Sequence, residues 1–189
     1  MNTVMSTATT KPKIATCWLG GCAGCHMSLL DIDERILDLV KLVDITASPI
    51  TDIKKPPEVK IALIEGAVCN EENLEVLHHY REKAEFLIAL GDCAVFGNLP
   101  AMRNMFTLQE CLEEAFLNTD STVNGKIPNG PDLPKLLPKV LPVPHVVKTD
   151  YCIPGCPPDA DTIWFVLTEL LAGRVPPPQQ IPYKLFKFD

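Results

Sequence analysis

Cysteine thiols are the side chains of this sequence best suited to chemistry, and two of them form a C-x-x-C pair in the segment CWLGGCAGC. Cys22 and Cys25 can touch the same metal ion or cluster, or they can form a reversible disulfide at the start of a helix. Four further cysteines lie near the ends of later apolar runs: Cys69, Cys93, Cys152 and Cys156. The pattern leaves three chemistries open, namely an iron–sulfur cluster, a structural zinc ion and thiol–disulfide exchange.

An iron–sulfur cluster accepts this cysteine pattern most easily. Structural zinc sites usually pair two C-x-x-C knuckles, whereas this chain has one. Thioredoxin-like exchange needs only Cys22 and Cys25 and leaves Cys93 and Cys156 without a role. Two close cysteines with single cysteines from two other loops can wrap a large inorganic core. A thiol oxidoreductase and a zinc-stapled interaction module stay open as alternatives.

The other cysteines have less clear roles. We expect Cys17 to pack within a strand and Cys111 to pack within an amphipathic helix, because free cysteine is often simply buried. The roles of Cys69 and Cys152 stay open, because either thiol would take the place of another cysteine as a metal ligand if its loop followed a different path. Neighbouring glycines suit tight turns around an anionic cluster and ordinary loops equally well: Gly20, Gly21, Gly24, Gly91 and Gly155.

Alternating strands and helices must position these cysteines. Short apolar runs predict strands within residues 13–19, 43–50, 59–67, 86–90 and 143–149. Helical spacing predicts a first helix with the apolar positions Leu29, Ile32, Ile36 and Val40. A second helix should carry Leu74, Leu77, Tyr80 and Ala84, and a third should lie around residues 105–116. The last helix should carry Ile163, Val166, Leu167 and Leu170 on one face.

The order of these elements predicts a single α/β domain with a flavodoxin-like, doubly wound parallel sheet. We assign residues 1–12 to a flexible N-terminal segment, 13–175 to the domain and 176–189 to a C-terminal tail. Residues 118–144, rich in Pro, Asn and Gly, form a long connection within the domain. In such a sheet, groups after the strands gather at one carboxyl edge, where the cysteines should converge.

Composition excludes several other functions. The net charge is −7, and the sequence shows no row of Lys and Arg residues that could contact a phosphate backbone, so we expect no nucleic-acid binding. No export signal and no apolar run long enough to span a bilayer is present, so we expect a cytoplasmic protein without direct membrane insertion. Neither a dinucleotide nor a nucleoside-triphosphate loop is visible, and no catalytic triad or carboxylate pair can be defended.

Four segments, taken in order, resemble the small subunit of nickel–iron hydrogenases: WLGGCAGC, IEGAV, GDCAVFG and IPGCPPDA. The resemblance runs from about residue 14 to residue 172 and implies a flavodoxin-like domain that holds one proximal [4Fe-4S] cluster against a large subunit with the nickel–iron site. It implies the following cluster ligands: Cys22, Cys25, Cys93 and Cys156. Glu65 of the IEGAV segment would lie near the cluster or at the large-subunit interface, and a plain capping role is nearly as consistent. By the resemblance, this chain itself carries no catalytic residue.

The details favour one branch of that family. No cysteine follows Cys156, so the chain has ligands for one cluster, and Gly21 replaces the acid of many membrane-type relatives. The chain therefore resembles the small subunit of cytoplasmic, bidirectional NAD-reducing hydrogenases, which implies diaphorase partners with flavin, further iron–sulfur clusters and NAD.

Other assignments stay open. An energy-converting membrane hydrogenase and a quinone oxidoreductase relative are alternatives, although the latter has adjacent first cysteines. FMN on this chain is a further alternative that the fold suggests only by analogy.

Overall fold

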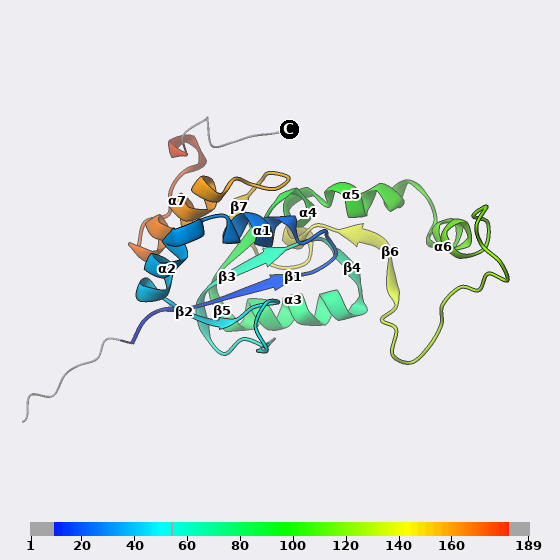
Figure 1. Cartoon of the computed structure of the whole chain (residues 1–189), viewed down its shortest axis with the longest axis horizontal. Coiled ribbons are helices and arrows are strands. Elements are labelled where there is room, and N and C mark those ends of the chain that lie inside the picture. The colour runs from blue at the N-terminus through cyan, green and yellow to red at the C-terminus, as the bar shows by residue number, and fades with distance from the viewer. Residues whose placement is uncertain (1–9, 54, 182–189) are drawn as a thin grey trace, which may run out of the picture.

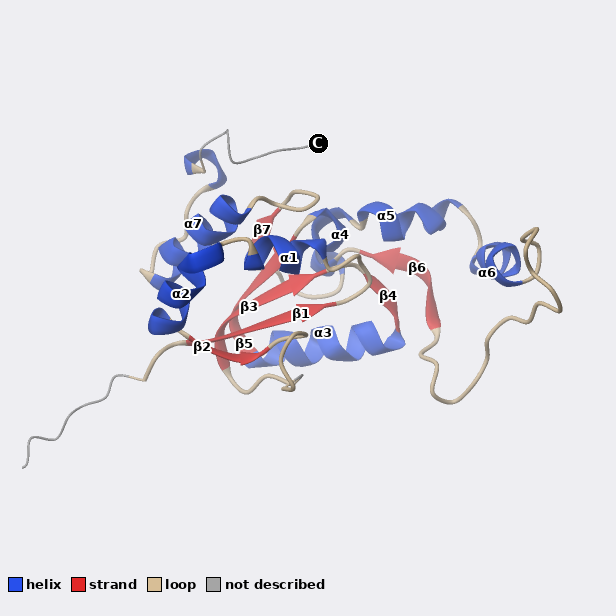
Figure 2. Ribbon diagram, viewed as in Figure 1, coloured by secondary structure: helices blue, strands red, loops and turns tan. Residues whose placement is uncertain are grey.

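A five-stranded parallel sheet forms the centre of the computed structural model, which describes residues 10–53 and 55–181 (Figures 1 and 2). Its strands, in spatial order, are β2 (Asp44–Ala47), β1 (Lys13–Trp18), β3 (Val59–Glu65), β5 (Ala84–Leu90) and β7 (Tyr151–Ile153). Every neighbouring pair in this sheet is parallel. Counting only these strands, the order is that of flavodoxin, so the predicted fold class is confirmed.

Each face of the sheet builds its own apolar core, because successive side chains of a strand point to opposite faces. Ile61 and Leu63 of β3 belong to one cluster of buried residues, and Ala62 and Ile64 belong to the other. This placement on both faces explains why the strands read as continuous apolar runs in the sequence.

Helices cover both faces of the sheet (Figure 2). The first core receives side chains from α1 (Gly24–Leu30), α2 (Ile36–Leu42) and α7 (Ala160–Leu171). The second receives them from α3 (Glu71–Lys83) and the short α4 (Asp92–Phe96). The face predicted for α7 is confirmed, since Ile163, Val166, Leu167 and Leu170 are buried, and the face predicted for α3 is confirmed at Leu77 and Tyr80. Leu74 of that face is only partly buried, and Ala84 lies outside the helix, as the first residue of β5.

An extension projects from one side of the sheet, at the right of Figure 1. It consists of α5 (Asn98–Ala101), the 3-10 helix η2 (Met102–Met105), α6 (Leu108–Phe116) and an antiparallel pair of β4 (Val68–Asn70) and β6 (Leu136–Leu141). The sequence predicted the helix around residues 105–116 but missed both strands. β6 is mostly exposed and contains Pro138, so it lacks the apolar run typical of a buried strand.

The single helix predicted after Cys25 is wrong. The chain forms α1, then the 3-10 helix η1 (Asp33–Arg35), then α2, with Asp33 in the left-handed region at φ +54°. The interruption rotates the second helix relative to the first. Leu39 is therefore buried, at 2% exposure, whereas the predicted Val40 is 43% exposed.

The predicted fifth strand is also misplaced. Residues 143–149 contain the 3-10 helix η3 (Val143–His145), and the strand begins later, at Tyr151. Val143 and Val147 are buried against the second core from this turn, which explains the apolar pattern. Pro142 and Pro144 lack backbone N–H groups and suit a turn better than a sheet.

The described residues after α7 pack on the body of the domain. η4 (Pro178–Gln180) follows an extended stretch, Ile181 joins the first core, and the Tyr151 hydroxyl donates a hydrogen bond to Pro176 O at 2.7 Å. Residues 1–9 of the expected N-terminal segment and 182–189 of the expected tail lie outside the described residues. Among the described helices, none combines the length and the hydropathy that crossing a bilayer requires.

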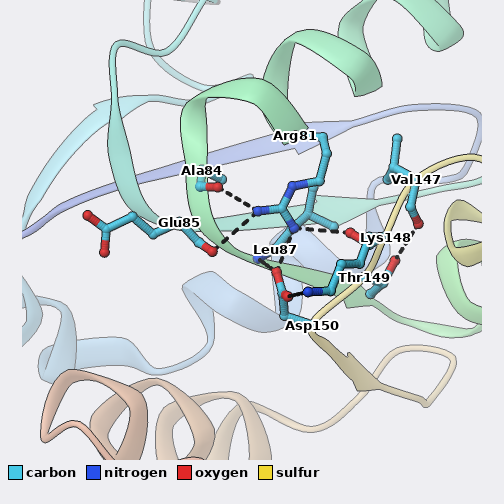
Figure 3. A network of polar contacts seen from close by, with 8 residues as sticks. All are labelled: Arg81, Ala84, Glu85, Leu87, Val147, Lys148, Thr149 and Asp150. Carbon is cyan, nitrogen blue, oxygen red and sulfur yellow. Dashed lines mark hydrogen bonds and ion pairs between the residues drawn. The ribbon is translucent and has the colours of Figure 1, made fainter.

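A polar network fixes the chain just before β7 (Figure 3). Arg81, near the end of α3, donates to Asp150 Oδ2 at 2.5 Å and to Ala84 O. The Leu87 N–H donates to the same Asp150 oxygen at 2.9 Å. Burial opposes ionisation of Asp150, but these hydrogen bonds and the Arg81 charge outweigh it and lower the pKa of the carboxyl below its usual value. The network thereby ties α3, β5 and the entry to β7 together.

Replacing Asp150 with asparagine should therefore destabilise the fold. We expect the free energy of unfolding at pH 7 to fall by about 1–3 kcal/mol, because a charge-assisted hydrogen bond is lost. Because the pKa of Asp150 is lowered in the folded state, its ionisation stabilises the protein at pH values above the unfolded pKa, near 3.8. This stabilisation is lost as the pH falls through the folded pKa of Asp150. The difference in the free energy of unfolding between wild type and variant, measured by urea unfolding, should shrink from pH 7 to pH 3.

Lys148→Ala is the control for this prediction. Lys148 is exposed, so its replacement should change the free energy of unfolding by only a few tenths of a kcal/mol. An equal effect of both substitutions would contradict this prediction.

Candidate metal centre

The four predicted ligands come from three separate loops at the carboxyl edge of the sheet. Cys22 and Cys25 follow β1, Cys93 lies in α4 after β5, and Cys156 follows β7. Their thiols are close enough to influence one another. Burial is the largest of the effects that raise the pKa of Cys25. The Glu65 charge raises this pKa further, and so do the charges of the other three thiols. The structure thus brings together the cysteines that the sequence singled out.

The first loop is held close to the end of β3. Gly20 pairs with Ala67 through two backbone hydrogen bonds of 2.8 and 2.9 Å. A Cβ atom on Gly20 would stand 2.2 Å from Cys69 Sγ, so only glycine lets the loop approach this closely. α1 begins directly afterwards, with Ala23 in the left-handed region at φ +64°. These contacts leave Cys22 exposed and bury Cys25.

The second loop leaves β5 through Gly91, which faces Cys25. Its φ is +82°, and a Cβ atom there would lie 2.2 Å from Cys25 Sγ. Both the backbone conformation and the lack of space therefore require glycine. Cys93 follows two residues later, in the first turn of α4, and reaches the same space as Cys25.

A reciprocal pair of hydrogen bonds joins the second loop to the third. The Asp92 N–H donates to Gly155 O at 2.9 Å, and the Gly155 N–H donates to Asp92 Oδ1 at 2.7 Å. Because Asp92 precedes Cys93 and Gly155 precedes Cys156, this pair sets the position of one cysteine against the other. Asn98 adds a donor to Cys156 Sγ at 3.5 Å.

Glu65, at the end of β3, supports the first loop from the protein interior. It is only 2% exposed, and its Oε2 accepts a hydrogen bond from the His26 N–H at 2.8 Å. The same oxygen pairs with His26 Nδ1. His26 follows Cys25 directly, so the carboxylate fixes the backbone beside a predicted ligand. The His26 ring also makes an edge contact with Trp18, with 5.5 Å between ring centroids.

The donor set suits a positively charged metal group. Burial raises the pKa of Cys93, and the neighbouring thiols Cys156 and Cys22 raise it further, while the Asn98 hydrogen bond opposes the shift. Thiols that resist ionisation in this way become ligands only when a cation compensates their charge. In the described part of the chain, no three His, Cys, Asp or Glu side chains are grouped closely enough to hold a single metal ion.

The remaining cysteines lie apart from this group. Cys17 is buried in β1, where burial and then the Glu65 charge raise its pKa to about 12. Cys111 lies in α6 as predicted. Cys69 follows β3, as predicted, but lies in the short strand β4 with its Sγ against Gly20. Cys152 lies within β7, whereas the sequence predicted it after that strand. All eight thiols are free.

Sequence reasoning missed several residues that organise the site. Asp92 stands directly before Cys93 in the quoted GDCAVFG segment, but its bond to Gly155 had no local signal. Ser28 donates to Pro158 O from 130 residues away and so joins α1 to the loop of Cys156. His26, directly after Cys25, pairs with Glu65 across 39 residues, a contact that no local pattern signals.

Comparison with known proteins gives a family match. Residues 22–170 match the family described as NADH ubiquinone oxidoreductase, 20 kDa subunit. The chain is 48% identical over 183 residues to the NAD-reducing hydrogenase HoxS subunit delta of Cupriavidus necator, covering 95% of this chain and 86% of the relative. It is 33% identical over 171 residues to the sulfhydrogenase 2 subunit delta of Pyrococcus furiosus, covering 90% of this chain and 66% of the relative. A third relative is part of the F420-non-reducing hydrogenase of Methanothermobacter marburgensis, at 42% identity over 169 residues. That match covers 87% of this chain but only 54% of the relative.

Solved structures agree with this assignment. A chain in the crystal structure of an NAD+-reducing [NiFe]-hydrogenase in the H2-reduced state superposes with a TM-score of 0.90 at 47% identity, covering 95% of this chain and 99% of that one. A chain of a [NiFeSe]-hydrogenase from Dm. baculatum superposes with a TM-score of 0.58 at 16% identity, covering 86% of this chain and 63% of that one. The second likeness concerns the fold alone.

Proposed function

Since this chain belongs to the NADH ubiquinone oxidoreductase 20 kDa subunit family, and within it to the small subunits of NAD-reducing nickel–iron hydrogenases, we propose that it is the electron-transfer subunit carrying the proximal [4Fe-4S] cluster. The chain is one part of a hydrogenase whose catalytic site lies on the large subunit. The proposed ligands are Cys22, Cys25, Cys93 and Cys156.

The convergence of these four thiols from three loops is the observation that carries the proposal. A thiol oxidoreductase would need only the C-x-x-C pair, whereas here Cys93 and Cys156 lie close enough to that pair to affect the ionisation of Cys25. When bound, a [4Fe-4S] cluster supplies one-electron redox chemistry. The electron path would run between the nickel–iron site of the large subunit and an NAD-reducing diaphorase module.

The residues of this chain hold the site and control its surroundings. Glu65 and the Asp92–Gly155 pair fix the loops, so the ligands need not rearrange when the charge of the site changes. Cys25 is buried, whereas Cys22 and Cys156 are exposed, so the site opens toward one side of the molecule. We propose that the large subunit closes this side and excludes water, which helps to set the redox potential.

Diaphorase subunits with flavin and further iron–sulfur clusters are the partners we propose on the electron-exit side, and the cytoplasm is the compartment. The 48% identity to a subunit of an NAD-reducing hydrogenase supports this choice over an energy-converting membrane hydrogenase.

Metal analysis of the full chain, purified anaerobically, tests the proposal. We expect about four irons and about four sulfides per chain, and an EPR signal that appears only on reduction. Iron supports the cluster, whereas stoichiometric zinc without redox activity would favour the zinc-stapled module. A reducible disulfide between Cys22 and Cys25, with no metal present, would favour thiol exchange.

A further inference from the structure

The helical part of the extension, which consists of α5, η2 and α6, carries apolar side chains that are exposed in the described structure. Met105 is 72% exposed, and Leu99, Met102 and Phe106 are each more than half exposed. α6 contains no buried residue, although its sequence is amphipathic. Exposed apolar side chains gathered in one region mark a surface that another molecule covers.

A groove between η2 and α6 gives this region a defined shape. Its volume is about 690 Å³, and its apolar lining includes Met102, Met105, Phe106, Cys111 and Ala115. A groove of this size admits one or more large side chains from a partner. We call it the η2–α6 groove.

Polar contacts hold the groove in place before any partner arrives. The Arg103 guanidinium donates to Leu137 O at 2.9 Å, and the side chain of Asn104 bonds both N–H and C=O of Val140. At the start of α6, Thr107 and Glu110 form a capping box. The groove is therefore anchored to β6, and binding to it needs little ordering of this chain.

The charge of the groove selects the chemistry of its occupant. Glu110 is committed to the helix cap, and the Arg103 guanidinium is committed to backbone oxygens. Glu114 also lines the groove and has no hydrogen bond or ion pair within residues 10–53 and 55–181. A partner segment with an apolar anchor and an adjacent Lys or Arg would complement it.

The position of the groove identifies the partner. Exposed apolar side chains continue from it to Leu99 in α5 and to Phe96 at the end of α4. Asn98, between these two residues in the sequence, contacts Cys156 Sγ. A protein that covers the exposed cysteines of the proposed cluster site therefore meets this surface next. We propose that the η2–α6 groove receives an apolar segment with a flanking basic residue from the nickel–iron large subunit. This inference rests on the proposed function, because it takes the large subunit to cover the cluster edge.

Met105→Asp tests the apolar part of the groove in the complex co-expressed with its partner subunits. We expect the dissociation constant between the large and small subunits to rise about 30-fold, the effect typical of an interface hot spot. Glu114→Lys should weaken the same contact by reversing the charge. Both side chains lie on the surface, so urea unfolding of the variant chains should match wild type.

Leu37→Asp is the matched control, because Leu37 is an exposed apolar residue of α2. Helix α2 lies on the opposite side of the molecule from α6 (Figure 1). The inference fails if Met105→Asp and Glu114→Lys leave the large-subunit dissociation constant unchanged, or if Leu37→Asp raises it equally. It also fails if the variants release only diaphorase subunits, or if native mass measurement shows that the groove pairs two copies of this chain. Iron per small subunit, measured in parallel, reports separately on the proposed cluster.

Discussion

Replacing Cys156 with alanine is expected to remove the proposed [4Fe-4S] cluster and to abolish hydrogen-dependent NAD+ reduction by the assembled hydrogenase. The substitution would leave one iron of that cluster without its proposed ligand, and no other described cysteine lies in the same loop. Iron should fall from about four per chain to well below one, and the EPR signal of the reduced protein should disappear. Activity should fall by more than the roughly 10- to 100-fold typical of mutations that only support a metal ligand.

Controls separate ligation from a general loss of folding. Cys111→Ala removes a thiol from α6, outside the group of four, and should retain iron. Cys93→Ala should behave like Cys156→Ala, because both thiols influence Cys25. Normal iron in Cys156→Ala, combined with iron loss in Cys152→Ala, would mean that β7 supplies the ligand and that the assignment of Cys156 is wrong.

Replacing Glu65 with leucine is expected to destabilise the fold and the cluster site together. The substitution leaves the His26 N–H and Nδ1 buried without their partner, and a buried polar group left unsatisfied costs about 1–3 kcal/mol. His26 is next to Cys25, so the loss should also loosen the first loop and lower the iron content. Urea unfolding and iron analysis of the purified chain measure the two effects.

Glu65→Gln is the matched variant for this prediction. Its amide oxygen can still accept the hydrogen bond from the His26 N–H, so it should retain most of the stability and the iron. Equal losses in both variants would show that the carboxylate charge, rather than the hydrogen bond, carries the effect. Wild-type stability in Glu65→Leu would contradict the supporting role that the geometry gives to Glu65.

Local sequence patterns predicted a core helix or strand well where the same face of that element is buried along its whole length. The run at residues 59–67 gave β3, and the helical spacing of Leu77 and Tyr80 gave α3, because burial on a fixed face leaves a regular apolar period. The same reasoning failed between Leu29 and Val40. There, Asp33 interrupts the helix, and apolar spacing by itself does not reveal a change of helix direction.

Partly exposed elements were harder to predict for a related reason. β6 is a strand because it pairs with β4, with Val68 opposite Leu141 and Asn70 opposite Leu136. Its own residues bury little surface, so its identity depends on a distant segment rather than on its local pattern. Residues 143–149 show the opposite error, since Val143 and Val147 reach the core from a turn.

The sequence by itself determined the alternation of strands and helices and the placement of Cys22, Cys25 and Cys93 after strands, from which their convergence at one edge follows. Only the tertiary structure decided how that edge is held. Glu65 meets His26 across 39 residues, and Asp92 meets Gly155 across 63. Apolar periodicity is a local property that one segment carries alone, whereas a hydrogen bond between distant loops exists only after both strands have taken their places in the sheet.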